Sequence, residues 1–422
     1  MKLTWSDPFI KRVIAALLAI NAVVLLLILL GRNLAAPAGA APTPDISAPV
    51  QITPRYPSPT PAIQASLWWD SVIANRDLGL VNRLHFHWVK QIFSWREIEP
   101  RQKGQFDWEQ ADQIVAAAEY HDLNIIARLD REPAWIRPAN TPDSVLTAPP
   151  QNVQDFGDYC HAIAARYKGR AIKAYEVWNE PNLAREWGGN PPDPAGYTKL
   201  LEACYKGIKS GDPDAIVISA GLAPTGTDSV EAMPDDQFFE GMYQAGASAY
   251  FDMLGVNAPG YAAPPQTSPD TAAKTPAYGS ARWACFRHVE DVRRIMLAHG
   301  DANKQIAIME MGWTTDKIHS EYSWFAVTED QQAQYLEGAY WWARLNWQPW
   351  IGFMTSIYIA DPYWTTNDEE FWWSITLPGY PQAGLRPAFY ELSRLPNWDS
   401  SLYGTATPGA DGSDGQDASP GS

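Results

Sequence analysis

Short apolar runs alternate with helical patterns along the central part of the chain. Runs of this length, bounded by polar turns, are typical of buried strands. We expect strands at residues 87–93, 124–130, 172–178, 215–220, 251–257, 305–310 and 350–359, with an eighth at 65–69.

The segments between these runs carry helix-start signals. Asp193 followed by Pro194 is typical of an N-cap with proline in the first turn. Thr328 and Gln331 have the spacing of a capping box, in which each side chain bonds the other residue's backbone N–H. An apolar stripe with the period of a helix face is formed by Phe286, Val289, Val292 and Met296.

This alternation of strands and helices predicts an α/β fold with a parallel sheet. The number of strands favours a closed (β/α)8 TIM barrel, and a doubly wound open sheet is the alternative. No predicted strand is followed by a GxGxxG turn, which argues against a nucleotide-binding open sheet. In a barrel, the working residues are expected at the C-terminal ends of the strands.

An apolar run at 13–30, interrupted only by Asn21, is just long enough to cross a bilayer as one helix. Lys2, Lys11 and Arg12 precede it, so we expect residues 1–31 to be a cytoplasmic stub and transmembrane signal anchor, with the rest outside the cell. The alternative is a signal peptide cleaved near the Ala-Gly-Ala sequence at 38–40, which would release a secreted protein.

Two further segments have compositions that do not favour a packed core. Residues 32–65 are rich in proline and lack helical or strand periodicity, so we expect a semi-rigid linker. Residues 401–422 are rich in Gly, Ser and Asp and are expected to be disordered. The folded domain is therefore expected at 66–400.

The amino-acid composition favours some kinds of ligand and argues against others. The 20 Trp, 19 Tyr and 13 Phe exceed what a core needs, and flat apolar faces suit sugar rings. A net charge of −16 argues against a nucleic-acid partner, because phosphate binding needs a basic face. The three cysteines lack zinc-site spacing. Cys160 and Cys204 lie on predicted neighbouring helices, and whether they form a disulfide stays open.

Two carboxylates end predicted strands in apolar or amide surroundings. Glu180 lies in the sequence AYEVWNEPNL, and Glu310 lies in QIAIMEMGWTT. Burying a carboxylate is costly unless it is paired, hydrogen-bonded or protonated. An internal salt bridge would explain one such residue, whereas two at strand ends favour paired-carboxylate chemistry.

At these residues the chain resembles clan A glycoside hydrolases, with families 5 and 39 the most similar. The Asn-Glu-Pro sequence at 179–181 matches the clan's acid/base motif at the end of strand four. The Glu-Met-Gly-Trp sequence at 310–313 matches the nucleophile motif at the end of strand seven. Segments 93–108 and 371–390 also resemble the clan, so the resemblance spans nearly all of residues 66–400.

The resemblance implies a retaining hydrolase that cleaves β-glycosidic bonds by double displacement through a glycosyl-enzyme intermediate. Glu180 would be the acid/base, Glu310 the nucleophile, and Asn179 the residue that holds the sugar 2-hydroxyl. Ionised Glu310 should then raise the pKa of Glu180. The expected partners are an oligo- or polysaccharide and the membrane, and no metal or other cofactor is expected. The alternative is a non-catalytic glycan-binding module at the cell surface.

The resemblance also suggests roles at other strand ends. Lys90 lies where the clan usually has an arginine that supports the nucleophile. Tyr261 is the candidate for a tyrosine that touches the nucleophile, with local loop packing as the alternative, and Asn257 lies at a position where the clan has a histidine. Asp130 ends a strand beside Arg128, where sugar binding and a structural ion pair are both open. Further candidates for substrate contact are Trp178, Trp313 and Trp364.

Overall fold

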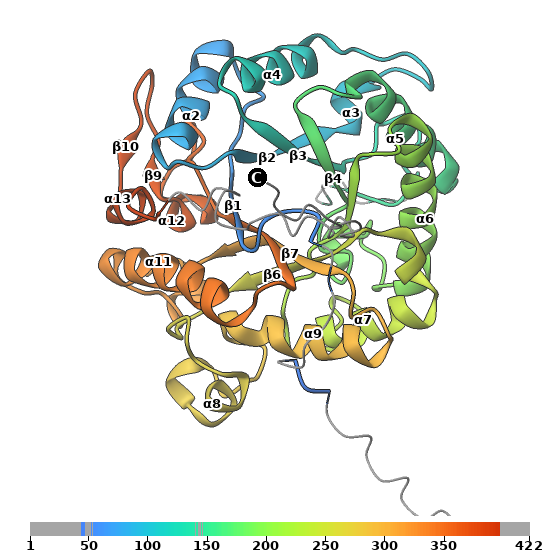
Figure 1. Cartoon of the computed structure of the whole chain (residues 1–422). Helices are drawn as coiled ribbons and strands as arrows, with labels where there is room; N and C mark the ends of the chain where they lie inside the picture. The colour runs from blue at the N-terminus through green and yellow to red at the C-terminus, as the bar shows by residue number, and fades with distance from the viewer. Residues whose placement is uncertain are drawn as a thin grey trace, which may run out of the picture. The chain divides into compact units, whose positions relative to one another are not determined.

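The computed structural model describes residues 44–46, 52, 54–139, 141, 145 and 147–396. The chain divides into two units, residues 1–45 and 46–422, and the described helices and strands belong to the second. In this unit eight parallel strands close into a barrel, each paired with its neighbours in chain order and β1 paired with β8 (Figure 1). The predicted (β/α)8 barrel is thus confirmed.

The strands are β1 (Thr60–Gln64), β2 (Trp88–Ser94), β3 (Asn124–Asp130), β4 (Ile172–Val177), β5 (Ile216–Ser219), β6 (Met253–Pro259), β7 (Gln305–Gly312) and β8 (Ile351–Ser356). From β2 onward they lie where the apolar runs predicted them. A two-stranded antiparallel sheet of β9 (Thr376–Leu377) and β10 (Gly384–Leu385) stands apart from the barrel.

Helices surround the strands as an outer ring (Figure 1). They are α2 (Ser71–Arg83), α4 (Glu109–Tyr120), α5 (Val153–Tyr167), α6 (Pro194–Gly211), α7 (Asp235–Gln244), α9 (Val289–Ala298), α11 (Glu329–Asn346) and α13 (Pro387–Leu392). The predicted starts are confirmed: the Asp193 side chain caps α6, and Thr328 with Gln331 forms the capping box of α11.

Short helices interrupt the connections. They are α3 (Trp95–Ile98), η1 (Ala184–Glu186), η2 (Ala247–Tyr250), α8 (Pro269–Lys274), η3 (Pro276–Tyr278), η4 (Phe286–His288), α10 (Ser320–Ser323) and α12 (Glu369–Trp373). Several of them follow the C-terminal end of a strand, where barrel loops build a functional site.

The first strand differs from the prediction. We expected it at 65–69, with 32–65 as linker, whereas β1 occupies Thr60–Gln64 and pairs with both β2 and β8. The prolines of this region resembled a linker, but a strand tolerates proline near its first residue, and Pro61 is second in β1. The barrel therefore begins within the range assigned to the linker.

The inner positions of the strands hold an apolar plug and, beyond it, a polar layer. The plug contains Ala62, Trp88, Ile126, Ala174, Ile216, Ile218, Met253, Ala307, Met309 and Phe353. Residues that alternate with these, such as Ile125, pack outward against the helices. Because side chains on one face of a strand recur every two residues, the next inward positions on β2, β3 and β4 are Lys90, Arg128 and Glu176.

Helices α5 and α6 pack closely and are joined covalently. Cys160 and Cys204 form a disulfide with their Cα atoms 5.3 Å apart, which settles the pairing that the sequence left open. The close approach depends on glycine: a Cβ on Gly207 would lie 2.2 Å from the backbone oxygen of Gly157.

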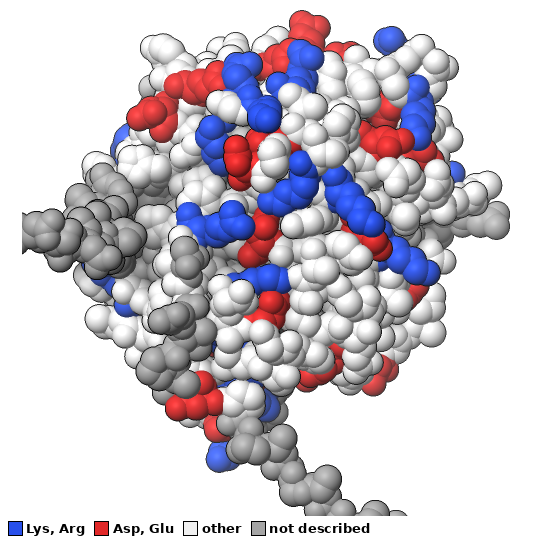
Figure 2. Space-filling view, turned by 45° about the vertical axis from the view of Figure 1, so that its right-hand side comes forward, with Lys and Arg blue, Asp and Glu red and all other residues white. Residues whose placement is uncertain are grey.

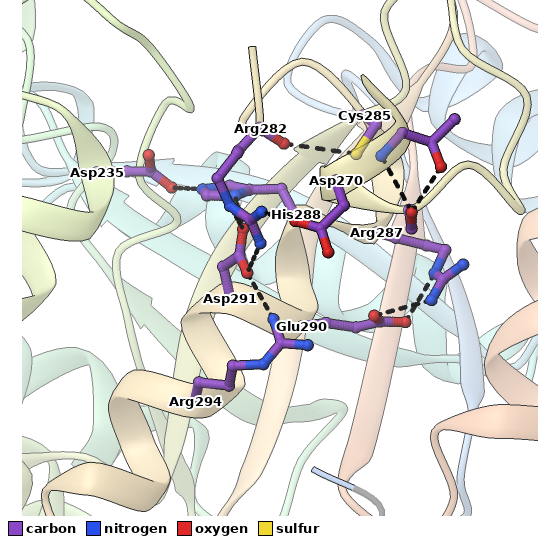
Figure 3. A network of polar contacts seen from close by, with 11 residues as sticks. Asp235, Asp270, Arg282, Cys285, Arg287, His288, Glu290, Asp291 and Arg294 are labelled. Carbon is purple, nitrogen blue, oxygen red and sulfur yellow. Dashed lines mark hydrogen bonds and ion pairs between the residues drawn. The ribbon is translucent and has the colours of Figure 1, made fainter. Parts of the chain in front are cut away.

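A polar network centred on the buried His288 fastens the long segment between β6 and β7 (Figure 3). His288 Nε2 lies 2.9 Å from Asp235 Oδ2, and His288 Nδ1 lies 3.3 Å from Asp291 Oδ2. Arg282 contacts Asp291 at 2.8 Å and also pairs with Asp270 of α8. The network therefore ties the start of α7 to α9 and to the loop that carries α8.

Within the part of the chain that the structure describes, we find no helix of sufficient length and apolarity to cross a membrane. The predicted anchor at 1–31 and the predicted tail at 401–422 lie outside the described residues.

Candidate active site

Buried ion pairs occupy the polar layer next to the apolar plug. Lys90 Nζ lies 2.9 Å from Glu176 Oε2, and both side chains are fully buried. On β3, Arg128 Nε lies 2.9 Å from Asp130 Oδ2. A buried charge is retained only when it is paired or hydrogen-bonded, and these pairs keep two cations at the base of the site.

Glu310 projects toward both cations from an irregular part of β7. The pairing of β6 with β7 shifts so that Asn257 lies opposite Glu310 and Met309 has no partner residue. Such a bulge re-aims the side chains that follow it. Glu310 Oε1 accepts hydrogen bonds from Arg128 at 3.3 Å and from Lys90 at 3.5 Å. Two positive charges thus face one oxygen of this carboxylate.

Glu180 lies on a tight turn that follows β4. Trp178 and Glu180 have φ angles of 75° and 39°, a region that residues with a side chain seldom adopt. Backbone hydrogen bonds hold the turn, from Trp178 N–H to the Leu129 carbonyl at 2.9 Å and from Glu180 N–H to the Gly221 carbonyl at 3.1 Å. Residues held in this way are concentrated at functional sites.

Two side chains orient the Glu180 carboxyl group. Asn257 Nδ2 donates to Oε1 at 2.9 Å, and Arg185 donates to Oε2 at 3.3 Å. The position of Asn257 requires glycine nearby, because a Cβ on Gly221 would lie 2.1 Å from Asn257 Oδ1.

The two carboxyl groups influence each other electrostatically. Burial raises the pKa of Glu180, the charge of Glu310 raises it further, and Arg185 and the hydrogen bond from Asn257 oppose the increase. The side chains of Glu180 and Glu310 remain 14% and 15% exposed, so a ligand can reach both. A carboxyl with a raised pKa beside a carboxylate that faces two cations is the arrangement that separates a proton donor from a nucleophile.

Asn179 belongs to the same cluster. Arg128 NH1 donates to Asn179 Oδ1 at 2.9 Å and to Glu310 Oε1 at 3.3 Å. One guanidinium therefore connects the residue beside Glu180 with Glu310. The planar group of donors in arginine suits such shared contacts.

Further acidic groups lie near Glu180. Burial, followed by the charge of Glu180, raises the pKa of Glu186 to about 7. Burial also raises the pKa of Glu369, which accepts a hydrogen bond from Tyr322. Both carboxyls interact electrostatically with Arg185, whose side chain is 66% exposed.

The structure brings together most of the residues predicted for the site. Salt bridges and hydrogen bonds through Arg128 and Glu310 connect Lys90, Asp130 and Asn179. Asn257 contacts Glu180 and lies opposite Glu310 on the neighbouring strand. Trp364 is half-buried, and its ring lies 5.3 Å from that of Tyr358, centroid to centroid.

Two predicted tryptophans do not face the site. Trp178 and Trp313 are fully buried, and their indole N–H groups donate to the carbonyls of Glu186 and Ala263 at 2.8 and 2.9 Å. An indole enclosed by the core has no face left for a sugar, so the prediction of substrate contact is wrong for both.

Tyr261 is also corrected. Its hydroxyl donates to the Pro224 carbonyl at 2.8 Å, and its ring packs against Trp283 and Phe325 with centroid separations of 5.1 Å. It therefore joins the loops after β5, β6 and β7, which is the local packing alternative, and its hydroxyl proton goes to Pro224 and not to Glu310.

Sequence reasoning missed two contributors. The contact of Arg128 with Glu310 was not assigned, and Glu176 was not considered. The available signal was the two-residue period of inward positions, which places both residues one step beyond the apolar plug on β3 and β4.

Charged groups elsewhere on the surface are mixed in sign. On the face drawn in Figure 2, Lys and Arg side chains lie among Asp and Glu side chains. Many form pairs, such as Arg170 with Glu119 at 2.7 Å. Among the residues that the structure describes, no group of three or more His, Cys, Asp or Glu is arranged to hold a metal ion.

Comparison with known families identifies one partial match. The model of the cellulase family (glycosyl hydrolase family 5) matches residues 54–244. This range contains β1 to β5 and Glu180, and it ends before Glu310. No curated protein matches the sequence.

Solved structures of glycoside hydrolases share the fold at low sequence identity. A family 39 glycoside hydrolase from Bacteroides cellulosilyticus WH2 is 16% identical with a TM-score of 0.56, over 80% of this chain and 63% of that one. The chain therefore spans less than two thirds of that relative.

A family 39 β-xylosidase from Caulobacter crescentus is 16% identical with a TM-score of 0.54, over 81% of this chain and 72% of that one. The enzyme XacCel5A, solved in complex with cellopentaose, is 12% identical with a TM-score of 0.51, over 80% of this chain and 98% of that one.

Proposed function

We propose that this chain is a retaining glycoside hydrolase that cleaves β-glycosidic bonds of an oligo- or polysaccharide. The observation that carries the proposal is the difference between two neighbouring carboxyl groups. Burial and the charge of Glu310 raise the pKa of Glu180, whereas the carboxylate of Glu310 faces Arg128 and Lys90. The match to the cellulase family model and the shared fold of glycoside hydrolases of families 5 and 39 support it.

In the first step, protonated Glu180 gives its proton to the glycosidic oxygen while a Glu310 oxygen attacks the anomeric carbon. The bond from that carbon to the departing oxygen breaks, and a glycosyl-enzyme ester forms. In the second step, Glu180 takes a proton from water, whose oxygen attacks the same carbon and releases Glu310. Asn179 accepts from Arg128 through Oδ1, which leaves Nδ2 as its donor to a sugar hydroxyl.

The experiment compares the full chain with Glu310→Ala and Glu180→Ala on a panel of aryl β-glycosides and β-linked polysaccharides. We expect turnover to disappear in Glu310→Ala, and azide to restore turnover of activated aryl glycosides by Glu180→Ala. NMR of the first product should show the β-anomer. An α-anomer would contradict retention, and glycan binding without turnover in all three proteins would leave only a binding module.

We also propose that the domain works outside the cytoplasm, held by the anchor predicted at 1–31. The disulfide between Cys160 and Cys204 supports this, because disulfides persist in oxidising compartments. Protease added to intact cells that express the full chain should cleave the domain. Protection of the domain until lysis would contradict the proposal, and recovery of the domain from the medium would indicate cleavage of the N-terminal segment.

A further inference from the structure

Two exposed aromatic side chains lie at the C-terminal ends of adjacent strands, on the same face of the barrel as the two carboxyls. Trp69 follows β1 and is 52% exposed, and Tyr363 follows β8 and is 70% exposed. β1 and β8 pair directly. The two rings meet edge to face, with centroids 5.2 Å apart.

A single buried carboxylate holds this pair in place. Asp361 is 5% exposed, and its Oδ2 accepts from the indole N–H of Trp69. Its Oδ1 accepts from the backbone N–H of Tyr363 at 2.9 Å. Because the polar atom of Trp69 is satisfied inside the protein, the part of the indole that remains exposed is apolar. An exposed and immobilised aromatic pair needs little further ordering to bind a flat apolar ligand face.

Aromatic side chains connect this pair with the catalytic carboxyls. Trp364 is adjacent to Tyr363 in sequence, and its ring packs at 71° against that of Tyr358. Tyr358 follows β8, and Glu310 lies near the end of the adjacent β7, where the Ile357 N–H donates to the Met311 carbonyl at 3.0 Å. The charge of Glu310 adds to the burial that raises the pKa of Tyr358. The aromatic surface is thus the series after β8 from Tyr358 through Trp364 to Tyr363, together with Trp69.

The order of the strands gives this surface a direction. Glu180 follows β4, which lies across the closed barrel from β8 and β1. The departing part of the substrate lies on the side of the acid that protonates it. The sugar attacked by Glu310, together with the units joined beyond it, extends the other way, toward β8 and β1.

From this geometry we propose that Trp69 and Tyr363 form a distal subsite for the glycone side of a neutral, β-linked glycan chain. The proposal rests on the function proposed above and deepens it, because it makes a chain of several sugars the preferred substrate. The carboxyl group of Asp361, which contacts both residues of the pair, disfavours an anionic sugar. The ligand class is thus a neutral oligo- or polysaccharide.

The test measures binding and turnover with the full chain. Calorimetry on Glu310→Ala uses neutral β-linked oligosaccharides of two to five units, with and without Trp69→Ala or Tyr363→Ala. We expect the affinity to rise with the number of sugar units. Each substitution should lower the affinity for the longer ligands by about three- to tenfold and leave that for the shorter ligands unchanged. Trp69→Phe, which keeps a ring but loses the hydrogen bond to Asp361, should keep only part of the gain.

Tyr120→Ala is the matched control, because Tyr120 is 84% exposed at the end of α4, away from the C-terminal ends of the strands. Three results would overturn the subsite: an equal loss of affinity for short and long ligands, no loss of affinity in either variant, or affinity that does not rise with ligand length. Turnover by the unsubstituted chain that Glu310→Ala abolishes would leave the proposed function standing in each of those cases. Length-dependent binding without any turnover would overturn the proposed function instead.

Discussion

At the residue scale, Arg128 connects three residues of the proposed site. Its NH1 contacts both Asn179 and Glu310, and its Nε contacts Asp130. A lysine would keep the charge but would lose this simultaneous set of contacts, because its donors sit on one nitrogen. The connection between Asn179 and Glu310 would then be broken.

We therefore predict that Arg128→Lys lowers kcat/KM on an aryl β-glycoside by about 10²-fold, as expected for loss of a preorganised donor. Steady-state kinetics give the measurement. Arg131→Lys is the control, since Arg131 is the neighbouring residue and lies 3.9 Å from Asp130 with 39% of its side chain exposed. An equal decrease in kcat/KM in both variants would contradict the explanation that the shared contacts of Arg128 are required for turnover.

Arg185 sets the proton affinity of Glu180 from the exposed side. Its positive charge lowers the pKa of Glu180, so Arg185→Met should raise that pKa. Glu180 must be protonated to act as acid, and it would then stay protonated to higher pH. We predict that the basic limb of the kcat/KM profile moves to higher pH. Arg170→Met, on a surface pair with Glu119, should leave the profile unchanged. A basic limb that stays or moves lower would contradict this assignment.

At the element scale, the disulfide joins two neighbouring helices of the outer ring. Cys160 lies in α5 and Cys204 in α6, and 44 residues of sequence separate them. Closing a loop of this length restricts the unfolded chain, which stabilises the fold by about 2–4 kcal/mol. The helices pack outside the barrel and supply no side chain to the candidate site.

Replacing both Cys160 and Cys204 with Ala should therefore lower the free energy of unfolding by about that amount, with little change in kcat/KM. Chemical denaturation measures the first quantity. Reductant should lower the stability of the unsubstituted chain in the same way and should not affect the double variant. Cys285→Ala, at the buried free cysteine, should keep the sensitivity to reductant. Stability that does not respond to reductant would contradict the prediction.

The elements differed in how far the sequence predicted them. Strands from β2 to β8 were predictable because a parallel strand buried on both faces is a continuous apolar run. β1 was displaced because its Thr-Pro-Ala-Ile-Gln sequence is short and contains proline. The two candidate carboxyls could be singled out in the sequence because a charge at the end of an apolar strand is costly without a role.

Roles that depend on three-dimensional packing were not predictable in this way. Trp313 and Tyr261 follow β7 and β6, yet the first is enclosed by the core and the second bonds a carbonyl of another loop. Arg128 on β3 contacts Glu310 on β7, and these two strands are four places apart in the barrel. Sequence spacing contains no information on which inward side chains meet across a closed barrel.

At the scale of the whole molecule, the network around His288 joins α7, α9 and the loop that carries α8 (Figure 3). Burial by itself lowers the pKa of His288, but the charge of Asp235 and the hydrogen bonds to Asp235 and Asp291 outweigh it and raise the pKa to about 10. The native chain therefore keeps this proton between pH 6.5 and 10, whereas the unfolded chain releases it near pH 6.5. The network contributes its full stability below pH 6.5 and loses that contribution as the pH rises through about 10.

We predict that the difference in unfolding free energy between the unsubstituted chain and His288→Gln shrinks by about 1.4 kcal/mol per pH unit across this window. Using the difference between the two proteins cancels the titration of all other groups, which both share. Urea denaturation at pH 6, 7.5 and 9 gives the slope. His299→Gln is the matched control, because His299 pairs with Glu240 at 2.7 Å on an exposed surface, where an ion pair contributes little. A difference that stays constant from pH 6 to 9 would mean that His288 is not held protonated by Asp235 and Asp291. A neutral His288 has a single N–H, so it would then donate to only one of Asp235 and Asp291, while the ion pairs of Arg282 would remain.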